Sequence, residues 1–265
     1  MTNMKKTMAA VMSTLILLTG CASGTETGIK EEETVEEEKE LTAQEYLGLA
    51  MEAQQNGDMA AAFENMAKAA SMGDPTACGI MAEAYHNGDA GGVDYAKALE
   101  YAEIAYEGGD AKGTLYYGSI YLNGYGVEQD TEKGLAAIEK AYELGDKKAP
   151  RYLGYAYLRG TGVNQDSAKA AEWFEIGVEG GDYTSMIELG KLLVSGEGIE
   201  ADTKRAEELF TKVATEREDH VGAPAMYELG KLAETAGDTE AAAQWYQKAL
   251  DNGFEDAQAA LDALK

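Results

Sequence analysis

YLNGYGVEQD, residues 121–130, returns 36 residues later as YLRGTGVNQD at 157–166, and once more as the weaker copy LVSGEGIEAD at 193–202. A Gly-x-Gly pair after an apolar run occurs both in phosphate-binding loops and in sharp turns. A dinucleotide fingerprint has a third glycine three residues after the second, and those positions hold Gln129, Gln165 and Ala201. The Gly-Lys-Ser/Thr of a P-loop is also missing, so the pattern favours a turn that recurs because the fold recurs.

The same period of 36 residues runs through most of the chain. A lysine or isoleucine near the end of each unit recurs at Lys68, Ile104, Lys140, Ile176, Lys212 and Lys248. The turn that follows carries a Gly-Asp pair at 73–74, 109–110, 145–146 and 181–182. Self-similarity at a period of about 20 to 50 residues is the signature of a solenoid. Residues 41–265 are therefore predicted to form a repeat domain.

Within each unit the apolar residues follow helical spacing. TLYYGSIYLNG at 114–124 gives one amphipathic segment, and TEKGLAAIEKAYELG at 131–145 gives a second that ends in a capping glycine. No long run alternates with a period of two residues, and proline is scarce. The prediction is an all-α fold, a solenoid of about six helix-turn-helix repeats.

Columns of equivalent residues predict how these helices pack. A small residue in the first helix of each unit is expected to face a small residue in the second, because helices approach closely only where side chains are small. Large residues on both helices are expected to form the core between units. The small residues are Ala82, Gly118, Gly154, Gly190 and Gly230, with Ala98, Gly134, Ala170, Ala206 and Ala242 opposite; the large ones are Tyr85, Tyr121, Tyr157 and Leu193, with Tyr101, Trp173, Leu209 and Trp245. In the turn, Val127, Val163 and Ile199 are expected to pack back onto the helices.

The first 20 residues have the features of a secretory signal peptide. MTNMKKTMAAVMSTLILLTG has two lysines near its start, Lys5 and Lys6, and continues with an apolar stretch that is too short for a comfortable membrane span. Its end, Leu18-Thr19-Gly20-Cys21, resembles the bacterial lipobox. The resemblance implies that Cys21 becomes a lipid-modified N-terminus. Residues 21–40 then form an acidic segment without aromatic residues, which predicts a flexible tether between lipid and repeats.

Composition excludes several classes of function. The chain has 22 Lys and Arg against 48 Asp and Glu, a formal net charge of −26, which disfavours nucleic-acid binding. Cys78 is left without a disulfide partner and is interpreted as a small core residue. The two histidines, His86 and His220, lie in different units without metal-ligand spacing, and are interpreted as solvent-facing or partly packed. We expect no metal, no small-molecule cofactor and no catalytic residues.

The repeated columns resemble the Sel1-like repeat family, a branch of the tetratricopeptide-type solenoids. The residues that carry the resemblance are Gly154 and Tyr157, the Gly160-Thr161-Gly162-Val163 turn, Asp166, Lys169-Ala170, Trp173-Phe174 and Gly181-Asp182. The resemblance covers about residues 41 to 260. It implies a right-handed superhelix whose inner face holds a protein or peptide, and with the lipid on Cys21 it implies an extracytoplasmic adaptor on a bacterial cell membrane.

The family's groove places several basic residues on one face of an acidic molecule. In tetratricopeptide-type units the first helix lines the concave side. By that resemblance the groove residues here are Arg151, Tyr155, Arg159, Lys191, Tyr227 and Lys231. We expect an extended peptide there, with an acidic or C-terminal carboxylate paired to Arg151, Arg159 or Lys191.

Two other classes of function remain open. Cysteine-rich secreted members of the family have been linked to cell-wall or β-lactam binding, so a cell-envelope enzyme or a wall-binding or β-lactam-binding protein is the alternative, although the paired cysteines of that subgroup are missing. A purely structural spacer is the other. The insertion TEREDHVGAP at 215–224 lengthens the fifth turn, as either a contact loop or a neutral insertion.

Overall fold

A computed structural model describes residues 40–264 of the 265-residue chain. The chain divides into two units, residues 1–40 and 41–265. The predicted signal peptide, Cys21 and nearly all of the predicted tether lie outside the described residues. Within 40–264 the regular secondary structure is entirely helical, so the prediction of an all-α solenoid is confirmed.

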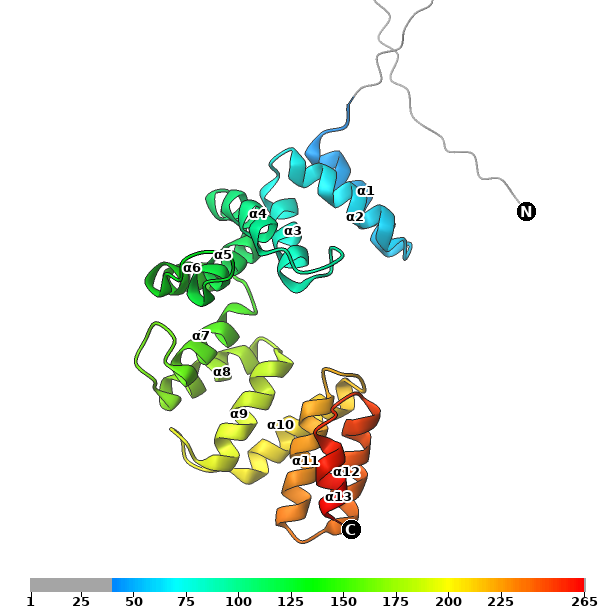
Figure 1. Cartoon of the computed structure of the whole chain (residues 1–265), viewed down its shortest axis with the longest axis vertical. Coiled ribbons are helices and arrows are strands. Elements are labelled where there is room, and N and C mark those ends of the chain that lie inside the picture. The colour runs from blue at the N-terminus through cyan, green and yellow to red at the C-terminus, as the bar shows by residue number, and fades with distance from the viewer. Residues whose placement is uncertain (1–39, 265) are drawn as a thin grey trace, which may run out of the picture. The chain divides into compact units, whose positions relative to one another are not determined.

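Thirteen helices make up the described part of the chain, as six pairs and a final short helix (Figure 1). The first helices of the pairs are α1 (Ala43–Gln55), α3 (Pro75–Asn87), α5 (Ala111–Asn123), α7 (Ala149–Arg159), α9 (Tyr183–Ser195) and α11 (Ala223–Thr235). The second helices are α2 (Met59–Ser71), α4 (Tyr95–Glu107), α6 (Thr131–Glu143), α8 (Ser167–Glu179), α10 (Thr203–Glu216) and α12 (Thr239–Asp251). The short helix α13 (Ala257–Ala263) packs on α12.

Each helix packs mainly on its neighbours in the chain. In the third unit, for example, α5 packs on its own partner α6 and on α3 and α4 of the preceding unit. Figure 1 shows the pairs following one another in chain order. Stacking of this kind is what allows units with small individual cores to be stable together.

Aspartates at fixed positions start most of these helices. Asp130 accepts a hydrogen bond from the Lys133 amide at 2.9 Å, and Asp182 accepts one from the Ser185 amide at 2.7 Å. A side-chain oxygen at this position satisfies one of the amides that an N-terminal turn leaves without a partner. The aspartates that cap in this way are Asp58, Asp74, Asp94, Asp110, Asp130, Asp166, Asp182, Asp202 and Asp238.

The two glycines of the repeated turn have different roles. Gly160 ends α7 in the left-handed conformation, at a φ of 69°, and its amide donates to the Ala156 carbonyl. Gly162 is also left-handed, at 75°, and a Cβ there would lie 2.6 Å from Cβ of Thr131 in the preceding unit. The first glycine therefore reverses the chain, and the second brings the loop onto the second helix of the unit before it.

The valine position of the turn packs as the sequence predicts. Val163 lies against the core that contains Leu135 and Leu153, and Ile199 lies against the core that contains Phe210. Val127 is half-buried. The Gly-x-Gly-Val turn is therefore an apolar anchor for the loop.

The predicted small-on-small packing is wrong for most units. A Cβ on Gly154 would lie 2.5 Å from Cε1 of Phe174, and one on Gly230 would lie 2.5 Å from Cδ1 of Tyr246. The glycine makes room for a fully buried ring four residues beyond the small position of the second helix. Among the glycines of this column, Gly118 alone has its predicted partner, Gly134, among the atoms nearest to an added Cβ, and there Ile138 takes the place of the ring.

The large residues, predicted to form the core between units, make ring contacts of both kinds: Tyr85 meets Tyr101 within one unit, and Trp173 meets Tyr142 of the preceding unit. The rings of Tyr85 and Tyr101 stack with their centroids 5.8 Å apart, and Trp173 meets Tyr142 edge-on at 5.3 Å. Cys78 is fully buried, and its thiol lies 3.4 Å from the Ala70 carbonyl oxygen. Burial raises the pKa of that thiol to about 11, as expected for a cysteine that only fills space.

None of the described helices has both the length and the apolar character needed to cross a bilayer.

Candidate functional site

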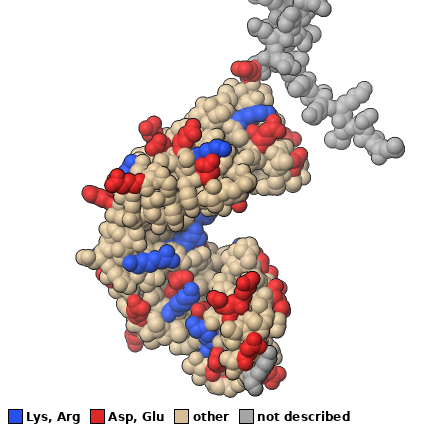
Figure 2. All heavy atoms as spheres, in the orientation of Figure 1, with Lys and Arg blue, Asp and Glu red and all other residues tan. Residues whose placement is uncertain are grey.

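The predicted groove residues separate into three groups in the structure. Tyr155 and Arg159 line one cavity, which we call the aromatic pocket. Lys191 and Lys231 line a second cavity, the paired-charge cavity. Arg151 and Tyr227 line neither of the two. On the face that Figure 2 shows, several Lys and Arg side chains gather over the region of α7 to α10.

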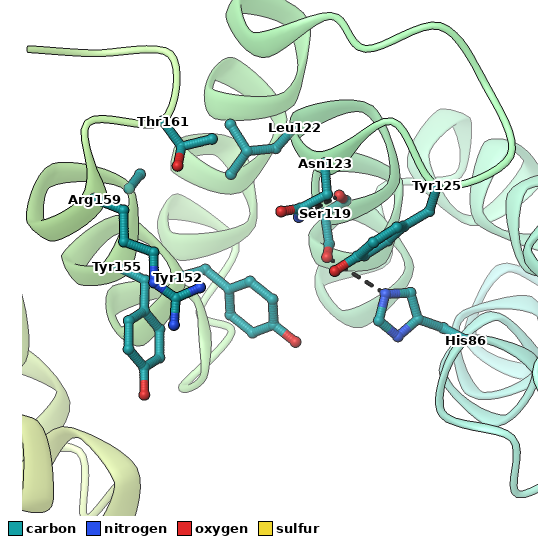
Figure 3. A pocket seen from close by; sticks show the side chains of 10 residues that line it. His86, Ser119, Leu122, Asn123, Tyr125, Tyr152, Tyr155, Arg159 and Thr161 are labelled. Atoms are coloured by element: carbon teal, nitrogen blue, oxygen red, sulfur yellow. Dashed lines mark hydrogen bonds between the residues drawn. The ribbon is translucent and has the colours of Figure 1, made fainter.

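The aromatic pocket is formed by the first helices of three consecutive units. Its volume is about 190 Å³. In Figure 3, Tyr155 and Arg159 of α7 lie on one side, His86 and Tyr125 lie on the other, and the ring of Tyr152 lies between them. The lining residues are His86 from α3, Ser119, Leu122 and Asn123 from α5, Tyr125 from the following loop, Tyr152, Tyr155, Ala156 and Arg159 from α7, and Thr161 from the loop after α7.

The charge of the aromatic pocket differs from that of the chain. No aspartate or glutamate lines it, although the chain has 48 of them. The one charged residue is Arg159, whose guanidinium lies 4.5 Å from the ring centroid of Tyr155. Among the four arginines of residues 40–264, Arg151, Arg205 and Arg217 each pair with a carboxylate, and Arg159 does not. The pocket therefore favours an anionic group.

His86 is held at the back of this pocket with both ring nitrogens engaged. Its Nδ1 lies 3.1 Å from the Asn87 side-chain oxygen, and its Nε2 lies 3.4 Å from the Ser119 hydroxyl. The rings of Tyr95, Tyr116 and Tyr125 surround it, at centroid distances of 4.9 to 5.6 Å. Burial lowers the pKa of His86, so its imidazole is neutral at pH 7.

Tyr155 links the aromatic pocket to the next unit. Its ring meets Phe174 of its own unit edge-on, with the centroids 5.5 Å apart, and its hydroxyl lies near Glu188 of the next unit. Burial first, and then the nearby Glu188 carboxylate, raise the pKa of its hydroxyl above the usual range. The hydroxyl thus stays protonated at any physiological pH.

One carboxylate ties together the three helices that form the aromatic pocket. Glu83 of α3 pairs with Lys112 of α5 at 2.6 Å and with Lys148, just before α7, at 2.5 Å. It also accepts a hydrogen bond from the Tyr116 hydroxyl at 2.9 Å. Burial on its own would raise the pKa of Glu83, but the two lysines outweigh it and lower the pKa to about 2. The pocket therefore has a preorganised frame.

Arg151 has a structural partner instead of an open position. Its guanidinium donates to the Asp182 carboxylate at 3.1 Å and to the Thr184 hydroxyl at 3.3 Å. Both charged side chains are mostly buried, with 20% and 13% of their surfaces exposed. Because Asp182 also caps α9, Arg151 fixes the junction between α7 and α9.

The paired-charge cavity lies between α7, α9 and α11 and has a volume of about 360 Å³. Lys191 pairs with Glu188 at 2.9 Å, and Lys231 pairs with Glu228 at 2.8 Å. The residues that line it are Leu158, Glu188, Lys191, Leu192, Val194, Ser195, Glu197, Glu228 and Lys231. Its lysines are therefore not free cations, and the cavity presents charges of both signs.

Tyr227 belongs to the core at the C-terminal end. Its ring lies 5.3 Å from that of Tyr246 and 4.8 Å from that of Phe254. Lys231 lies 5.8 Å from the same ring. Tyr227 thus supports the helix that carries Lys231.

Sequence reasoning did not identify His86, Tyr125 and Tyr152 as pocket residues. Tyr125 is the variable residue between the two turn glycines, where the next two copies have Thr161 and Glu197. The concentration of tyrosines in the third and fourth units was the available signal.

Comparison with known proteins identifies the repeats. The family model described as the Sel1 repeat matches six segments, at residues 42–74, 75–110, 111–146, 149–182, 184–216 and 221–254. A search of curated proteins finds no match.

Two solved structures share the fold. A protective antigen of uropathogenic Escherichia coli strains, described as displaying an SLR fold, is 28% identical with a TM-score of 0.63; the match covers 84% of this chain and 48% of the antigen. This chain thus spans about half the length of the antigen. A Sel1 repeat protein from Oxalobacter formigenes is 23% identical with a TM-score of 0.66, over 79% of this chain and 88% of that protein.

Proteins with these repeats generally act as scaffolds for protein interactions and are typically not catalytic. With six matched segments that together span most of its length, the chain belongs to the Sel1 repeat family.

Proposed function

We propose that this chain is a lipid-anchored, extracytoplasmic adaptor of a bacterial cell envelope that binds a peptide segment of a partner protein along the first helices of its repeats. The observation that carries the proposal is the aromatic pocket: it contains an arginine without an ion pair and no carboxylate, in a chain of net charge −26. An isolated cation beside aromatic rings is a recognition feature.

Helix α7 contributes residues to both cavities. This arrangement favours a ligand long enough to reach both cavities. Arg159 lines the aromatic pocket, while Leu158, the residue before it in α7, lines the paired-charge cavity. Tyr155 in the first cavity lies near Glu188, which lines the second. A peptide that crosses α7 would first contact Arg159, which can bind an anionic group, and then the Lys191–Glu188 and Lys231–Glu228 ion pairs.

Photocrosslinking in intact membranes tests the adaptor function. A crosslinker placed at Thr161, in the loop beside the aromatic pocket, is expected to trap a discrete partner protein. The trapped band should disappear when Arg159→Glu is added, because the reversed charge repels an anionic ligand. A crosslinker at the exposed Lys204 of α10 is the matched control. Equal bands at both positions, or no band at Thr161, would exclude the adaptor function.

The lipid anchor is supported by the sequence LTGC at residues 18–21 and by the acidic segment that follows. Cys21→Ala should abolish incorporation of labelled palmitate and release the protein from the membrane fraction. Full membrane retention of the variant without label would contradict the anchor.

We propose no catalytic role for the repeats. Purified protein is expected to show no hydrolysis of cell-wall polymer or of β-lactams. Turnover that depends on the aromatic pocket would favour the enzyme alternative.

A further inference from the structure

We propose that the aromatic pocket recognises the C-terminal aromatic residue of the partner peptide. In this arrangement the terminal carboxylate pairs with Arg159, and the aromatic side chain lies among the rings of Tyr125, Tyr152 and His86. The inference rests on the peptide-binding function proposed above and gives it a chemical specificity.

The anion half of the site follows from the distribution of charge. Two carboxylates that lie near lining residues of the pocket are already neutralised: Glu83, near His86, pairs with two lysines, and Glu188, near Tyr155, pairs with Lys191. Arg159 is exposed and has only the Tyr155 ring beneath it. A guanidinium offers two parallel N–H groups, which match the two oxygens of a carboxylate.

The other half of the site is formed mainly by aromatic rings. Both nitrogens of His86 are engaged within the chain, and Ser119 is the partner of one of them. The Asn123 amide donates to the Ser119 carbonyl at 2.9 Å. A sugar ring needs several convergent donors and acceptors, and these polar side chains are largely occupied. What remains open is an aromatic surface, which suits an aromatic side chain.

The size of the pocket limits the ligand to about one residue. Cavities for drug-sized molecules are about 300 to 1,000 Å³, and this one is about 190 Å³. One aromatic side chain with its carboxylate is in proportion to that volume. An internal aromatic residue has no carboxylate of its own at the backbone, so the pairing with Arg159 selects a chain end.

The rings are fixed before a ligand arrives. Tyr125 stacks on Tyr95 with the centroids 4.6 Å apart and the planes 11° from parallel. The Glu83 ion pairs hold α3, α5 and the start of α7 together. A rigid aromatic pocket loses little conformational entropy on binding, which favours a specific ligand over a general apolar one.

Peptide titration of the purified full-length chain in detergent tests the inference. The probes are a labelled six-residue Gly-Ser peptide ending in phenylalanine, its C-terminal amide, and the same peptide ending in alanine. The free acid should bind about tenfold or more tightly than either of the others, since a charge-assisted pair and a buried ring are each lost in one probe. Equal affinity of acid and amide would overturn the proposal.

Two variants assign the effect to the pocket. Arg159→Gln should remove the preference for the acid over the amide, and Tyr125→Ala should weaken the preference for phenylalanine over alanine. Arg159 is exposed and has no ion pair, so Arg159→Gln is expected to leave the thermal midpoint unchanged. Tyr125→Ala removes the stack on Tyr95, so circular dichroism is used to check that this variant is folded. Lys204→Gln is the control and should bind like the wild type. Retention of both preferences in Arg159→Gln would overturn the assignment.

Competition distinguishes the source of the ligand. N-acetylphenylalanine should compete only weakly, because a peptide makes further contacts along α7. If N-acetylphenylalanine competes as strongly as the peptide, the natural ligand is a free aromatic acid and not a protein partner. If only acidic wall saccharides compete, the natural ligand is a glycan. If the titration fails while the Thr161 crosslink persists, the adaptor function stands and the terminal-residue specificity does not.

Discussion

The Glu83 carboxylate binds the Lys148 ammonium group, which lies 65 residues further along the chain, at a distance of 2.5 Å. The same carboxylate binds Lys112 at 2.6 Å. One acidic side chain therefore joins three consecutive units at their first helices. This contact determines the spacing of the helices that line the aromatic pocket.

Replacing Glu83 by glutamine should destabilise the fold. Two lysines would lose their counter-charge, and with the Glu83 side chain only 17% exposed we expect a loss of about 1 to 3 kcal/mol in the free energy of unfolding. Denaturant unfolding followed by circular dichroism measures it. Glu64→Gln is the matched control, because the Glu64–Lys68 pair is exposed within a single helix and its loss should change little. Equal effects of the two substitutions would contradict the role of Glu83.

The same ion pairs make the free energy of unfolding depend on pH in the acid range. The pKa of Glu83 is about 2 in the folded chain, against an ordinary value of 4.5. A carboxylate with a lowered folded pKa stabilises the fold above its unfolded pKa and loses that contribution as the pH falls toward the folded one. The wild type should therefore lose stability between about pH 4.5 and 2, and Glu83→Gln should show a shallower slope in that range.

His86 gives a second pH dependence in a separate range. Burial lowers the pKa of His86 below 6.5, so the unfolded chain binds the proton first. The free energy of unfolding should fall as the pH drops below about 6.5, since protonation would place a charge among Tyr95, Tyr116 and Tyr125, with only the paired Glu83 nearby. The variant His86→Gln removes the group that titrates. A wild type and variant with parallel pH profiles between 6.5 and 5 would refute this.

Gly230→Ala tests the packing of glycine against an aromatic ring. The new Cβ would lie 2.5 Å from the Tyr246 ring, which is anchored by a hydrogen bond from its hydroxyl to Glu234 at 2.7 Å. We expect a loss of about 1 to 3 kcal/mol from overpacking. Gly48→Ala in the exposed part of α1 has no atom within 4 Å of the new Cβ and should be neutral or stabilise by up to about 1 kcal/mol. Thermal unfolding of both variants gives the comparison.

Arg151→Gln should lower stability and leave ligand affinity unchanged. Arg151 pairs with the capping Asp182, and both side chains are mostly buried, so its loss should cost about 1 to 2 kcal/mol. Arg205→Gln is the control, because its pair with Glu175 is more exposed and should matter less. If Arg151→Gln strongly reduced peptide binding without changing stability, Arg151 would be a ligand-binding residue and not a structural one.

The repeat could be predicted from the sequence because each of its columns has a local cause. Asp166 caps α8 through its own side chain, and Gly160 ends α7 through its own backbone, so neither depends on distant residues. The predicted partner of Gly154 was wrong. A glycine repeated at this position indicates that a neighbouring group comes close, but it does not indicate which side chain that is. In this structure Phe174 fills it.

The candidate site was predictable only in part, since it depends on contacts between units. The resemblance to tetratricopeptide-type units named Tyr155 and Arg159 as groove residues, and both line the same cavity. Whether a basic residue is free depends on carboxylates about 30 residues away, as Asp182 is from Arg151. No spacing rule within one unit could distinguish Arg151 from Arg159.

The contact of Gly162 with Thr131, and of Gly198 with Ser167 and Ala168, is the same contact made one period apart. These two Gly-x-Gly turns thus each attach to the second helix of the preceding unit, α6 for Gly162 and α8 for Gly198. A tandem duplication of one whole unit would supply both halves of this junction at once, whereas an insertion of any other length would not. The array could therefore lengthen by genetic duplication in steps of a single period without any new interface having to arise.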